Sequence, residues 1–286
     1  MTPTPDSLSL RPMDAVEAAP TPVVRTDLAA NGLWIVARDV ALVLAYWWLA
    51  TGLIFLIQRD PITRLFGVAA ATALGAVGVW LVVSTRDSAT PKGALRAWLG
   101  AALLWAWPAT LLYAGLPAGP ADAATRALPY AQGSWPMALD AIRATIANDV
   151  IGVLLLGVLV VLTIGHANRM SVWAYLLFWV VQQSAKLNIF FGVERAGAEF
   201  LPMHLRFLER FFGPSENSPL LGATIIVLSI VAALFAWQAS RTKLGYLRNG
   251  LALLTAVLVL AVVEHLVIGG VFEAPLWKAF LDARGY

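Results

Sequence analysis

Glu264 and His265 are adjacent residues whose side chains could do chemistry inside a membrane. They lie in the apolar stretch 251–268, four residues before it ends. Ionisable side chains are costly at membrane depth, so they are commonly functional where they occur. A carboxylate beside an imidazole could relay a proton, or could bind a metal together with ligands from other helices. Alternatively, both residues lie near the lipid headgroups and pair with polar groups of neighbouring helices.

The spacing around His265 allows a second kind of chemistry. Ala261 precedes it by four residues and Gly269 follows it by four, so small residues share its helical face. Such a face has room for a tetrapyrrole macrocycle whose metal binds the imidazole nitrogen. Small residues at this spacing also mediate helix packing, so pigment ligation and simple packing both stay open.

Further polar residues lie near the ends of two other apolar stretches. The stretch 172–191 ends in VVQQSAKLNIFFG, which contains Lys186 and Asn188. Lys186 could bind an acidic partner or a tetrapyrrole propionate, or could extend its long stem to the interface. Asp149 lies at the start of the stretch 150–164 and at roughly helical spacing from Arg143, which favours capping or an ion pair. The candidate polar or ligand-binding site therefore comprises Glu264, His265, Asp149, Lys186 and Asn188.

The composition is that of a membrane protein. Of the 286 residues, 59% are hydrophobic and 13% are charged, whereas a soluble domain has about 25% charged residues. A soluble enzyme, a nucleic-acid-binding protein and a disordered chain are therefore disfavoured, and the formal charge of +3 forms no basic patch. Without cysteine there is no disulfide, thiolate nucleophile or cysteine-ligated metal. Motifs of nucleotide-binding loops, serine hydrolases and zinc proteases are also missing, which favours binding over catalysis.

Seven apolar stretches are long enough, or nearly so, to cross a bilayer. A hydrocarbon core about 30 Å thick needs roughly 20 apolar residues in a helix, and each span must be helical to satisfy its own backbone. We therefore predict an all-α, polytopic membrane helix bundle of about seven transmembrane helices plus one interfacial amphipathic helix. The stretches are approximately 34–57, 65–83, 95–116, 150–164, 172–191, 220–237 and 251–268.

The predicted organisation is a single membrane domain with short ends. Residues 1–33 are polar and rich in Pro, Ala, Asp and Thr, a composition typical of a disordered extension. Residues 34–278 form the transmembrane domain, and residues 279–286 form a short tail. The basic residues divide ten to ten between the two sides and do not fix the orientation. The tight basic loops 86–96 and 241–248 favour a cytoplasmic N-terminus.

The segment 199–212, EFLPMHLRFLERFF, has an amphipathic pattern. An α-helix over this segment would place four apolar side chains on one face, namely Leu201, Leu205, Leu208 and Phe212. Such a helix is typical of a segment that lies in the membrane interface. Glu199, His204 and Arg206 would then form part of a polar surface. A helix that caps the end of the bundle is the alternative.

Several stretches of the chain together resemble one known family. The longest is SAKLNIFFGVERAGAEFLPMHLRFLERFF, residues 184–212, which is similar to a family stretch of the form SAKLNxFLGVxNxxEEFLPxHLxYLxSYF. Shorter matches are STRDS after the second apolar stretch, WAW before Pro108, and EHLVI at 264–268 with Trp277 shortly afterwards. They occur in the family's order and span residues 34–277. On these motifs the chain resembles the PuhE family, photosynthetic complex assembly protein 2.

The resemblance implies a multi-pass protein of the bacterial inner membrane in anoxygenic phototrophs. Such a protein would assist assembly of the photosynthetic reaction centre and core light-harvesting complex, and would influence bacteriochlorophyll production. Its partners would be reaction-centre or light-harvesting subunits or bacteriochlorophyll enzymes, together with the lipid bilayer, and not nucleic acid. A membrane enzyme or pigment carrier that binds a metal or tetrapyrrole through His265 is the alternative. A small-molecule transporter ranks third, because few charges lie at membrane depth.

The chain departs from the family pattern at three places. The family has His-Glu after its Trp-x-Trp, where this chain has Pro108 and Ala109. A second His-Glu corresponds to Asn148 and Asp149. An Asn-rich run corresponds to residues 195–198. If these pairs cooperate with Glu264 and His265 in one site, this chain retains only part of it.

Overall fold

The computed structural model describes residues 22–58, 60–116, 127–243 and 245–272, together with residues 125 and 279. Residues 1–21 of the predicted extension and 280–286 of the predicted tail lie outside the described residues. The chain divides into two compact units, Met1–Ile35 and Val36–Tyr286. The first helix, α1 (Pro22–Leu56), begins within the predicted extension. Every contact described below lies within the second unit.

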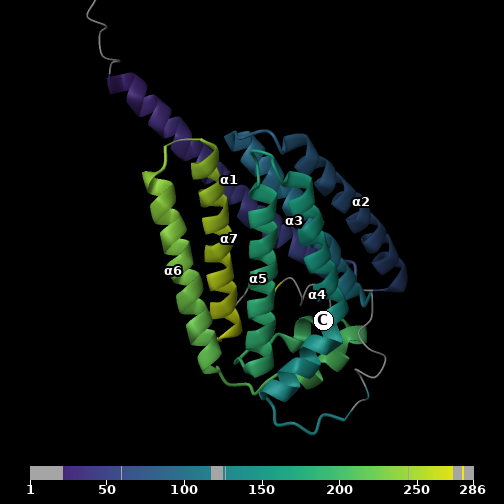
Figure 1. The fold of residues 1–286 in the computed structure, drawn as a ribbon. Coiled ribbons are helices and arrows are strands. Elements are labelled where there is room, and N and C mark those ends of the chain that lie inside the picture. The colour runs from purple at the N-terminus through teal and green to yellow at the C-terminus, as the bar shows by residue number, and fades with distance from the viewer. Residues whose placement is uncertain are drawn as a thin grey trace, which may run out of the picture. The chain divides into compact units, whose positions relative to one another are not determined.

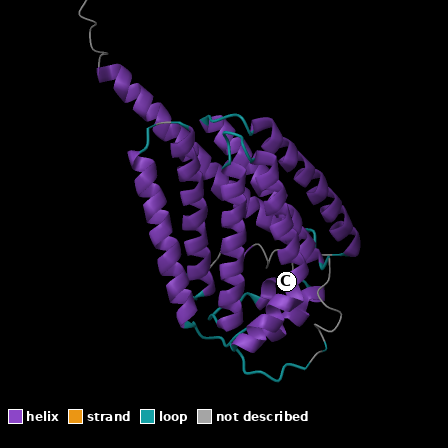
Figure 2. Cartoon of the chain, viewed as in Figure 1, coloured by secondary structure: helices purple, strands orange, loops and turns teal. Residues whose placement is uncertain are grey.

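All regular structure in the described residues is helical, as predicted. In this part of the chain α1 is followed by six further long helices and by two short 3-10 helices between α5 and α6 (Figures 1 and 2). These elements are α2 (Pro61–Thr85), α3 (Pro91–Ala114), α4 (Trp135–Thr163), α5 (Met170–Phe191), η1 (Ala198–Phe200), η2 (Met203–Phe211), α6 (Pro219–Arg241) and α7 (Tyr246–Ile268).

Six helices of the described chain are long and apolar enough to cross a membrane, namely α1 from Ala37 onward, α2, α3, α4, α6 and α7. α5 has 22 residues, but four polar side chains lower the hydropathy of its C-terminal half: Gln182, Gln183, Lys186 and Asn188. α5 packs against four helices, namely α3, α4, α6 and α7, while Trp173 and Val180 keep part of its surface exposed. The predicted short span 150–164 belongs to the 29-residue helix α4, because the polar segment before it is helical too.

The helix ends follow local sequence signals. Asp60 caps α2 by accepting hydrogen bonds from the backbone N–H groups of Ile62 and Thr63, each at 2.9 Å. Proline occupies the first turn of α2, α3, α4 and α6, where its missing N–H costs no hydrogen bond. α3 ends at Gly115, whose φ of +71° is left-handed and therefore suits glycine.

α2 and α3 approach each other through glycine. A Cβ atom built on Gly78 would lie 2.7 Å from the carbonyl oxygen of Gly100, and one built on Gly100 would lie 2.8 Å from that of Gly78. Only residues without a side chain permit this backbone approach. The centre of the bundle is then filled by large buried side chains, among them Trp98, Tyr175 and Phe178.

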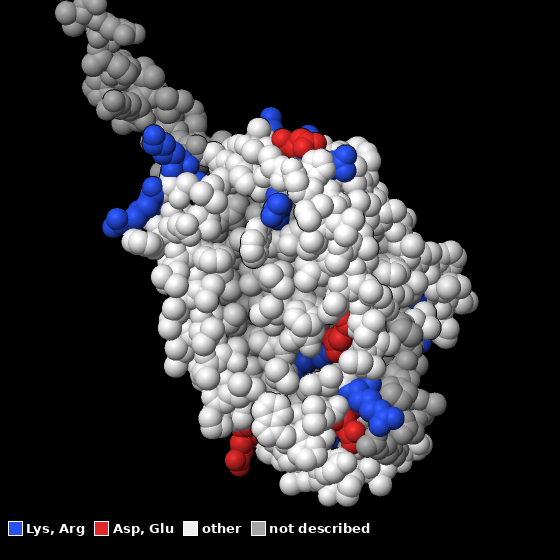
Figure 3. All heavy atoms as spheres, in the orientation of Figure 1, with Lys and Arg blue, Asp and Glu red and all other residues white. Residues whose placement is uncertain are grey.

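The outer surface of the bundle is apolar. Large side chains such as Phe66, Val161 and Ile226 are mostly exposed, which is expected where a helix faces lipid. On the face shown in Figure 3, a band of uncharged side chains lies between charged groups at one end of the helices and charged groups scattered over the opposite half. This band has the character of a surface in contact with the hydrocarbon core.

The Asn168 side chain forms hydrogen bonds with three of the connections between helices at one end of the bundle. Its Nδ2 donates to the carbonyl oxygens of Thr85 and Gly93, both at 3.0 Å. Its Oδ1 accepts from the N–H of Met170 at 3.1 Å and from the hydroxyl of Tyr246 at 3.0 Å. The amide therefore makes four hydrogen bonds within the protein, and it joins the α2–α3 connection to the starts of α5 and α7.

α1 contacts the other helices through long side chains. Its backbone makes few close approaches to other helices in the described chain. The Tyr46 hydroxyl donates to the carbonyl oxygen of Ala102 on α3 at 2.7 Å. Asp39 is 1% exposed, pairs with Arg38 and accepts a hydrogen bond from Asn249 on α7. Because side chains rather than backbones meet here, space is left between α1 and the inner helices.

Candidate functional site

The polar C-terminal half of α5 is the centre of the candidate site. Its polar side chains extend toward four different neighbours. Lys186 faces α4, Ser184 faces α7, and Asn188 donates through Nδ2 to the Thr224 hydroxyl on α6 at 3.1 Å. Gln182 lines a pocket that α5 shares with α1, α3 and α7. The polar residues that distinguish α5 from the six apolar helices therefore connect it to the surrounding bundle.

Asp149 and Lys186 form an ion pair between α4 and α5. Lys186 Nζ lies 2.8 Å from each carboxylate oxygen of Asp149, and Gln183 Nε2 donates to Asp149 Oδ1 at 2.8 Å. Both charged side chains are only 13% exposed. The partner of Asp149 is thus Lys186 on the next helix and not Arg143, because the two helices place these side chains opposite each other.

His265 is enclosed between α7 and α5. Its side chain is completely buried, and Nδ1 lies 2.8 Å from the carbonyl oxygen of Ala261. Because a carbonyl only accepts, Nδ1 carries the proton of that hydrogen bond. Nε2 lies 3.1 Å from the Ser184 hydroxyl. Both ring nitrogens therefore have partners within the protein, and neither is open to the metal of a macrocycle.

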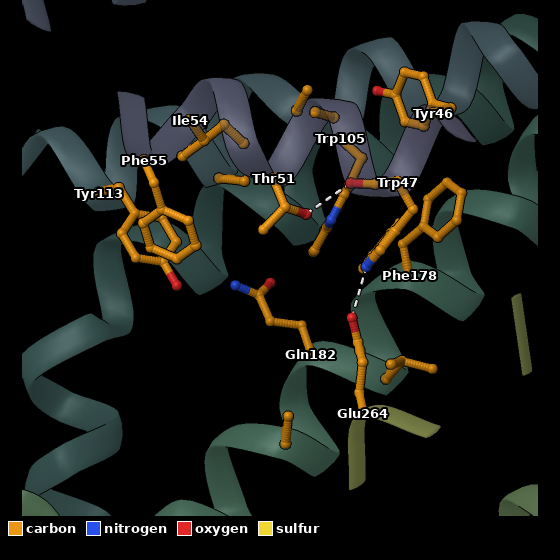
Figure 4. Close-up of a pocket in the computed structure, with 15 residues that line it drawn as sticks. Tyr46, Trp47, Thr51, Ile54, Phe55, Trp105, Tyr113, Phe178, Gln182 and Glu264 are labelled. Carbon is orange, nitrogen blue, oxygen red and sulfur yellow. Dashed lines mark hydrogen bonds between the residues drawn. The ribbon is translucent and has the colours of Figure 1, made fainter. Parts of the chain in front are cut away.

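Glu264 points in another direction from its neighbour His265. Its Oε1 accepts a hydrogen bond of 2.6 Å from Trp47 Nε1 on α1. Figure 4 shows the Glu264 carboxylate directed toward Trp47, with the Gln182 amide and the Tyr113 hydroxyl in the same space. The adjacent residues therefore serve two different contacts, and they do not form a direct Glu-His relay.

A pocket of about 220 Å³ lies between α1, α3, α5 and α7. Its walls contain six aromatic side chains, and four alanines leave the central space unfilled. The aromatic residues are Tyr46, Trp47, Phe55, Trp105, Tyr113 and Phe178, and the alanines are Ala50, Ala106, Ala109 and Ala185. The remaining lining residues are Thr51, Ile54, Val181, Gln182 and Glu264. The pocket is therefore an aromatic chamber with a few hydrogen-bonding groups.

Three groups in this pocket have unused hydrogen-bonding capacity among the described residues. The Gln182 amide and the Tyr113 hydroxyl make no hydrogen bond to that part of the chain, and Glu264 uses only one of its two oxygens. An amide both donates and accepts, a phenol donates, and a carboxylate accepts. At membrane depth such groups need a partner, because transfer of an unbonded polar group into an apolar medium is unfavourable.

The predicted interfacial segment folds as two 3-10 helices, η1 and η2. A 3-10 helix repeats every three residues, so Leu205 and Phe211 share the buried face, and Phe212 lies outside the helix. Phe211 belongs to a buried apolar cluster with Ala138 on α4 and Phe190 on α5. The segment thus covers one end of the bundle, which is the capping alternative, and its outer face exposes Arg206.

His204 connects η2 to the end of α3. Its Nε2 lies 2.8 Å from the carbonyl oxygen of Tyr113 and therefore donates to it. Partial burial lowers the pKa of His204 below its ordinary value, and the nearby positive charge of Arg64 lowers it further. The hydrogen bond to the Tyr113 carbonyl raises the pKa, but by less than burial lowers it. The neutral imidazole is thus favoured at this position. Glu199 is exposed at the start of the same segment.

The predicted site residues surround one helix but form separate contacts. Asp149 and Lys186 meet, His265 and Asn188 lie on other sides of α5, and Glu264 turns to α1. No group of three His, Asp or Glu side chains in the described chain could hold a metal ion. Sequence reasoning missed the pocket residues Trp47, Tyr113 and Gln182. No local signal marks Trp47, because its partner Glu264 lies 217 residues away.

The first two places where the chain departs from the family pattern contact each other. Asn148 Nδ2 on α4 donates to the carbonyl oxygen of Pro108 on α3 at 2.7 Å, and Asn148 is buried. The next residue on each helix belongs to the site, because Ala109 lines the pocket and Asp149 pairs with Lys186. The substitutions thus fall beside the polar centre of the bundle.

These features define a helical, multi-pass membrane protein with polar groups buried between its helices. The chain belongs to the family described as "Protein of unknown function (DUF3623)", which matches residues 34–285. It is similar to an "Uncharacterized 30.4 kDa protein in puhA 5'region" of Rhodobacter capsulatus, with 26% identity over 242 residues, 82% of this chain and 85% of that protein. No solved structure matches the chain.

Proposed function

We propose that this chain is an integral membrane assembly factor of the PuhE kind, which acts by binding during formation of the photosynthetic reaction centre and core light-harvesting complex. The observation that carries this proposal is the similarity, over most of both chains, to a protein from the puhA 5' region of Rhodobacter capsulatus. The motif resemblance over residues 184–212 supports the same role. The membrane would be the bacterial inner membrane.

Two surfaces suit an assembly factor that works by contact. The helices expose large apolar side chains around the bundle, and these could pack against transmembrane helices of photosynthetic subunits or bacteriochlorophyll enzymes. The η1–η2 segment adds a polar surface at one end, where Glu199 and Arg206 are exposed. Asp149, Lys186, Asn188 and His265 bond within the bundle, so their part in this function is to hold the helices together.

The basic connections favour one orientation of the bundle. A hydrogen bond from Asn168 N to the carbonyl oxygen of Arg86 joins the α2–α3 and α4–α5 connections at one end, and the positive-inside rule places this basic end in the cytoplasm. η2 would then lie on the opposite side. Because the chain has no cysteine, Ala89→Cys and Met203→Cys can each be labelled with an impermeant maleimide in intact cells. We expect labelling of Met203→Cys but not of Ala89→Cys. Labelling of Ala89→Cys alone would show that the bundle has the opposite orientation.

Deletion of the gene in a phototrophic host tests the assembly role. We expect a severalfold loss of reaction centre and core antenna, measured by membrane absorption spectra and immunoblots, with recovery on complementation. The double variant Glu199→Ala/Arg206→Ala should complement poorly, whereas Lys92→Ala/Lys243→Ala, with exposed charges at the other end, should complement fully. Unchanged complex levels after deletion would refute the proposal. An absorption spectrum of the purified protein tests the pigment-carrier alternative.

A further inference from the structure

The pocket between α1 and the inner helices has the features of a ligand site. α1 forms one wall with Tyr46, Trp47, Thr51 and other side chains, while its outer side exposes Leu49 and Leu53. Helices inside a protein usually leave no cavity of this size between them, because protein interiors pack densely. Here the backbones stand apart and alanines face the gap. A hydrophobic molecule could therefore enter from the lipid beside α1.

The size of the pocket suits a ligand with a single ring. A cavity of about 150 Å³ is sufficient to hold benzene in an engineered protein interior, and sites for larger ligands occupy about 300–1,000 Å³. At about 220 Å³, this pocket accommodates one six-membered ring with small substituents. The four linked rings of a tetrapyrrole macrocycle would exceed it. The aromatic walls favour a flat ring that can stack or meet them edge-to-face.

The polar groups define what that ring must carry. The Gln182 amide and the Tyr113 hydroxyl can donate to carbonyl oxygens, and Glu264 and the Gln182 carbonyl can accept from hydroxyl groups. Figure 4 shows Gln182 between Tyr113 on one side and Glu264 on the other, so these groups face a common space. A ring with oxygen substituents would satisfy them. A plain hydrocarbon would leave them unbonded.

We infer that this pocket binds the head group of a lipid-soluble quinone or quinol. The ring would lie among the aromatic side chains, its oxygens would bond with Gln182, Tyr113 and Glu264, and its prenyl chain would extend beside α1 into the lipid. The inference goes beyond the assembly role and does not depend on it. Binding requires only the isolated membrane protein, so failure of one proposal leaves the other standing.

Equilibrium dialysis between nanodiscs tests the site. Decylubiquinone is distributed between nanodiscs that contain the protein and empty nanodiscs of the same lipid, so simple partition into lipid cancels. Ala109→Phe fills the pocket, and Gln182→Leu removes its amide at similar volume. The matched controls are Ala233→Phe and Gln238→Leu, which make the same changes at exposed positions on α6. Gel filtration and thermal unfolding of each variant establish that it is folded.

The expected result is a saturable excess of one quinone per wild-type chain. Both pocket variants should weaken this binding at least tenfold, and both α6 controls should bind as the wild type does. If Ala109→Phe does not fold, Gln182→Leu alone decides. No saturable excess in the wild type, equal binding by Gln182→Leu, or equally effective competition by decylbenzene would overturn the inference.

Discussion

Two side-chain amides in the same bundle, one buried and one partly buried, have opposite surroundings. Asn168, at the end formed by the α4–α5 connection, makes four hydrogen bonds within the protein. Gln182, on the polar half of α5, makes none in the described chain and faces a pocket. The two side chains carry the same functional group. Their difference separates a polar group that holds the fold together from one that is available to a ligand.

The comparison extends to the charged groups of the bundle. Asp149 and Lys186 satisfy each other with help from Gln183, as Asn168 satisfies its neighbours. Glu264 resembles Gln182 in part, because only one of its oxygens is bonded. Loss of a fully bonded group should therefore destabilise the fold, whereas loss of an open group should leave stability nearly unchanged. Single substitutions at these groups test that division.

Lys186→Met should cause the largest loss of stability. It leaves the Asp149 carboxylate without its cation at a nearly buried site, and breaking a buried pair in this way costs about 3–5 kcal/mol. Denaturant unfolding in detergent micelles measures the change. The double variant Asp149→Asn/Lys186→Met removes both charges and should recover a large part of the loss. Equal stability of the single and double variants would show that the pair is not a coupled unit.

Asn168→Ala should destabilise the bundle by about 2–3 kcal/mol, because several backbone groups lose their buried partners. Gln182→Ala, by contrast, should cost less than about 1 kcal/mol, since it removes no hydrogen bond within the described chain. The same unfolding experiment compares the two variants. A larger loss of unfolding free energy for Gln182→Ala than for Asn168→Ala would show that Gln182, and not Asn168, holds the fold together.

Trp47→Phe tests the half-bonded carboxylate. The substitution keeps an aromatic ring but removes the N–H that donates to Glu264, and one such hydrogen bond contributes about 1 kcal/mol. Trp80→Phe on the exposed surface of α2 is the matched control and should have no measurable effect. Equal melting temperatures of both variants and the wild type would show that Glu264 has other partners.

The smallest effect is a pH dependence from His204. Because its pKa is lower in the folded protein than in the unfolded chain, the unfolded chain binds more protons below about pH 6.5. Stability should therefore fall slightly as pH decreases from 7 to 5. His204→Gln, which can still donate to the Tyr113 carbonyl, should lack this part of the decrease, whereas His166→Gln should retain it. If His204→Gln lost as much stability as the wild type between pH 7 and pH 5, the decrease would arise from other titrating groups.

The sequence predicts the helices well because hydropathy is a local property. Apolar runs located the long helices, although the run at 150–164 covered only the second half of α4. α5 is not among the six helices apolar enough to cross a membrane, because its C-terminal half carries polar residues that bond to neighbouring helices. The sequence did not predict which polar groups meet. Asp149 forms its ion pair with Lys186 rather than Arg143, and Glu264 accepts a hydrogen bond from Trp47. Those partners depend on how helices turn relative to one another. The period of η2 was also missed, because an α-helix and a 3-10 helix bury different members of the same pattern.

The attachment of α1 has a consequence for synthesis of the protein. Two of its polar contacts, those of Asp39 and Trp47, are made with α7, and their partners Asn249 and Glu264 follow 210 and 217 residues later. α1 leaves the ribosome before α7, so it cannot complete these contacts until α7 is inserted. During translation Asp39 has only Arg38 beside it to offset its charge. α7 therefore completes the attachment of α1, and a chain that stops before α7 leaves α1 without these two bonds.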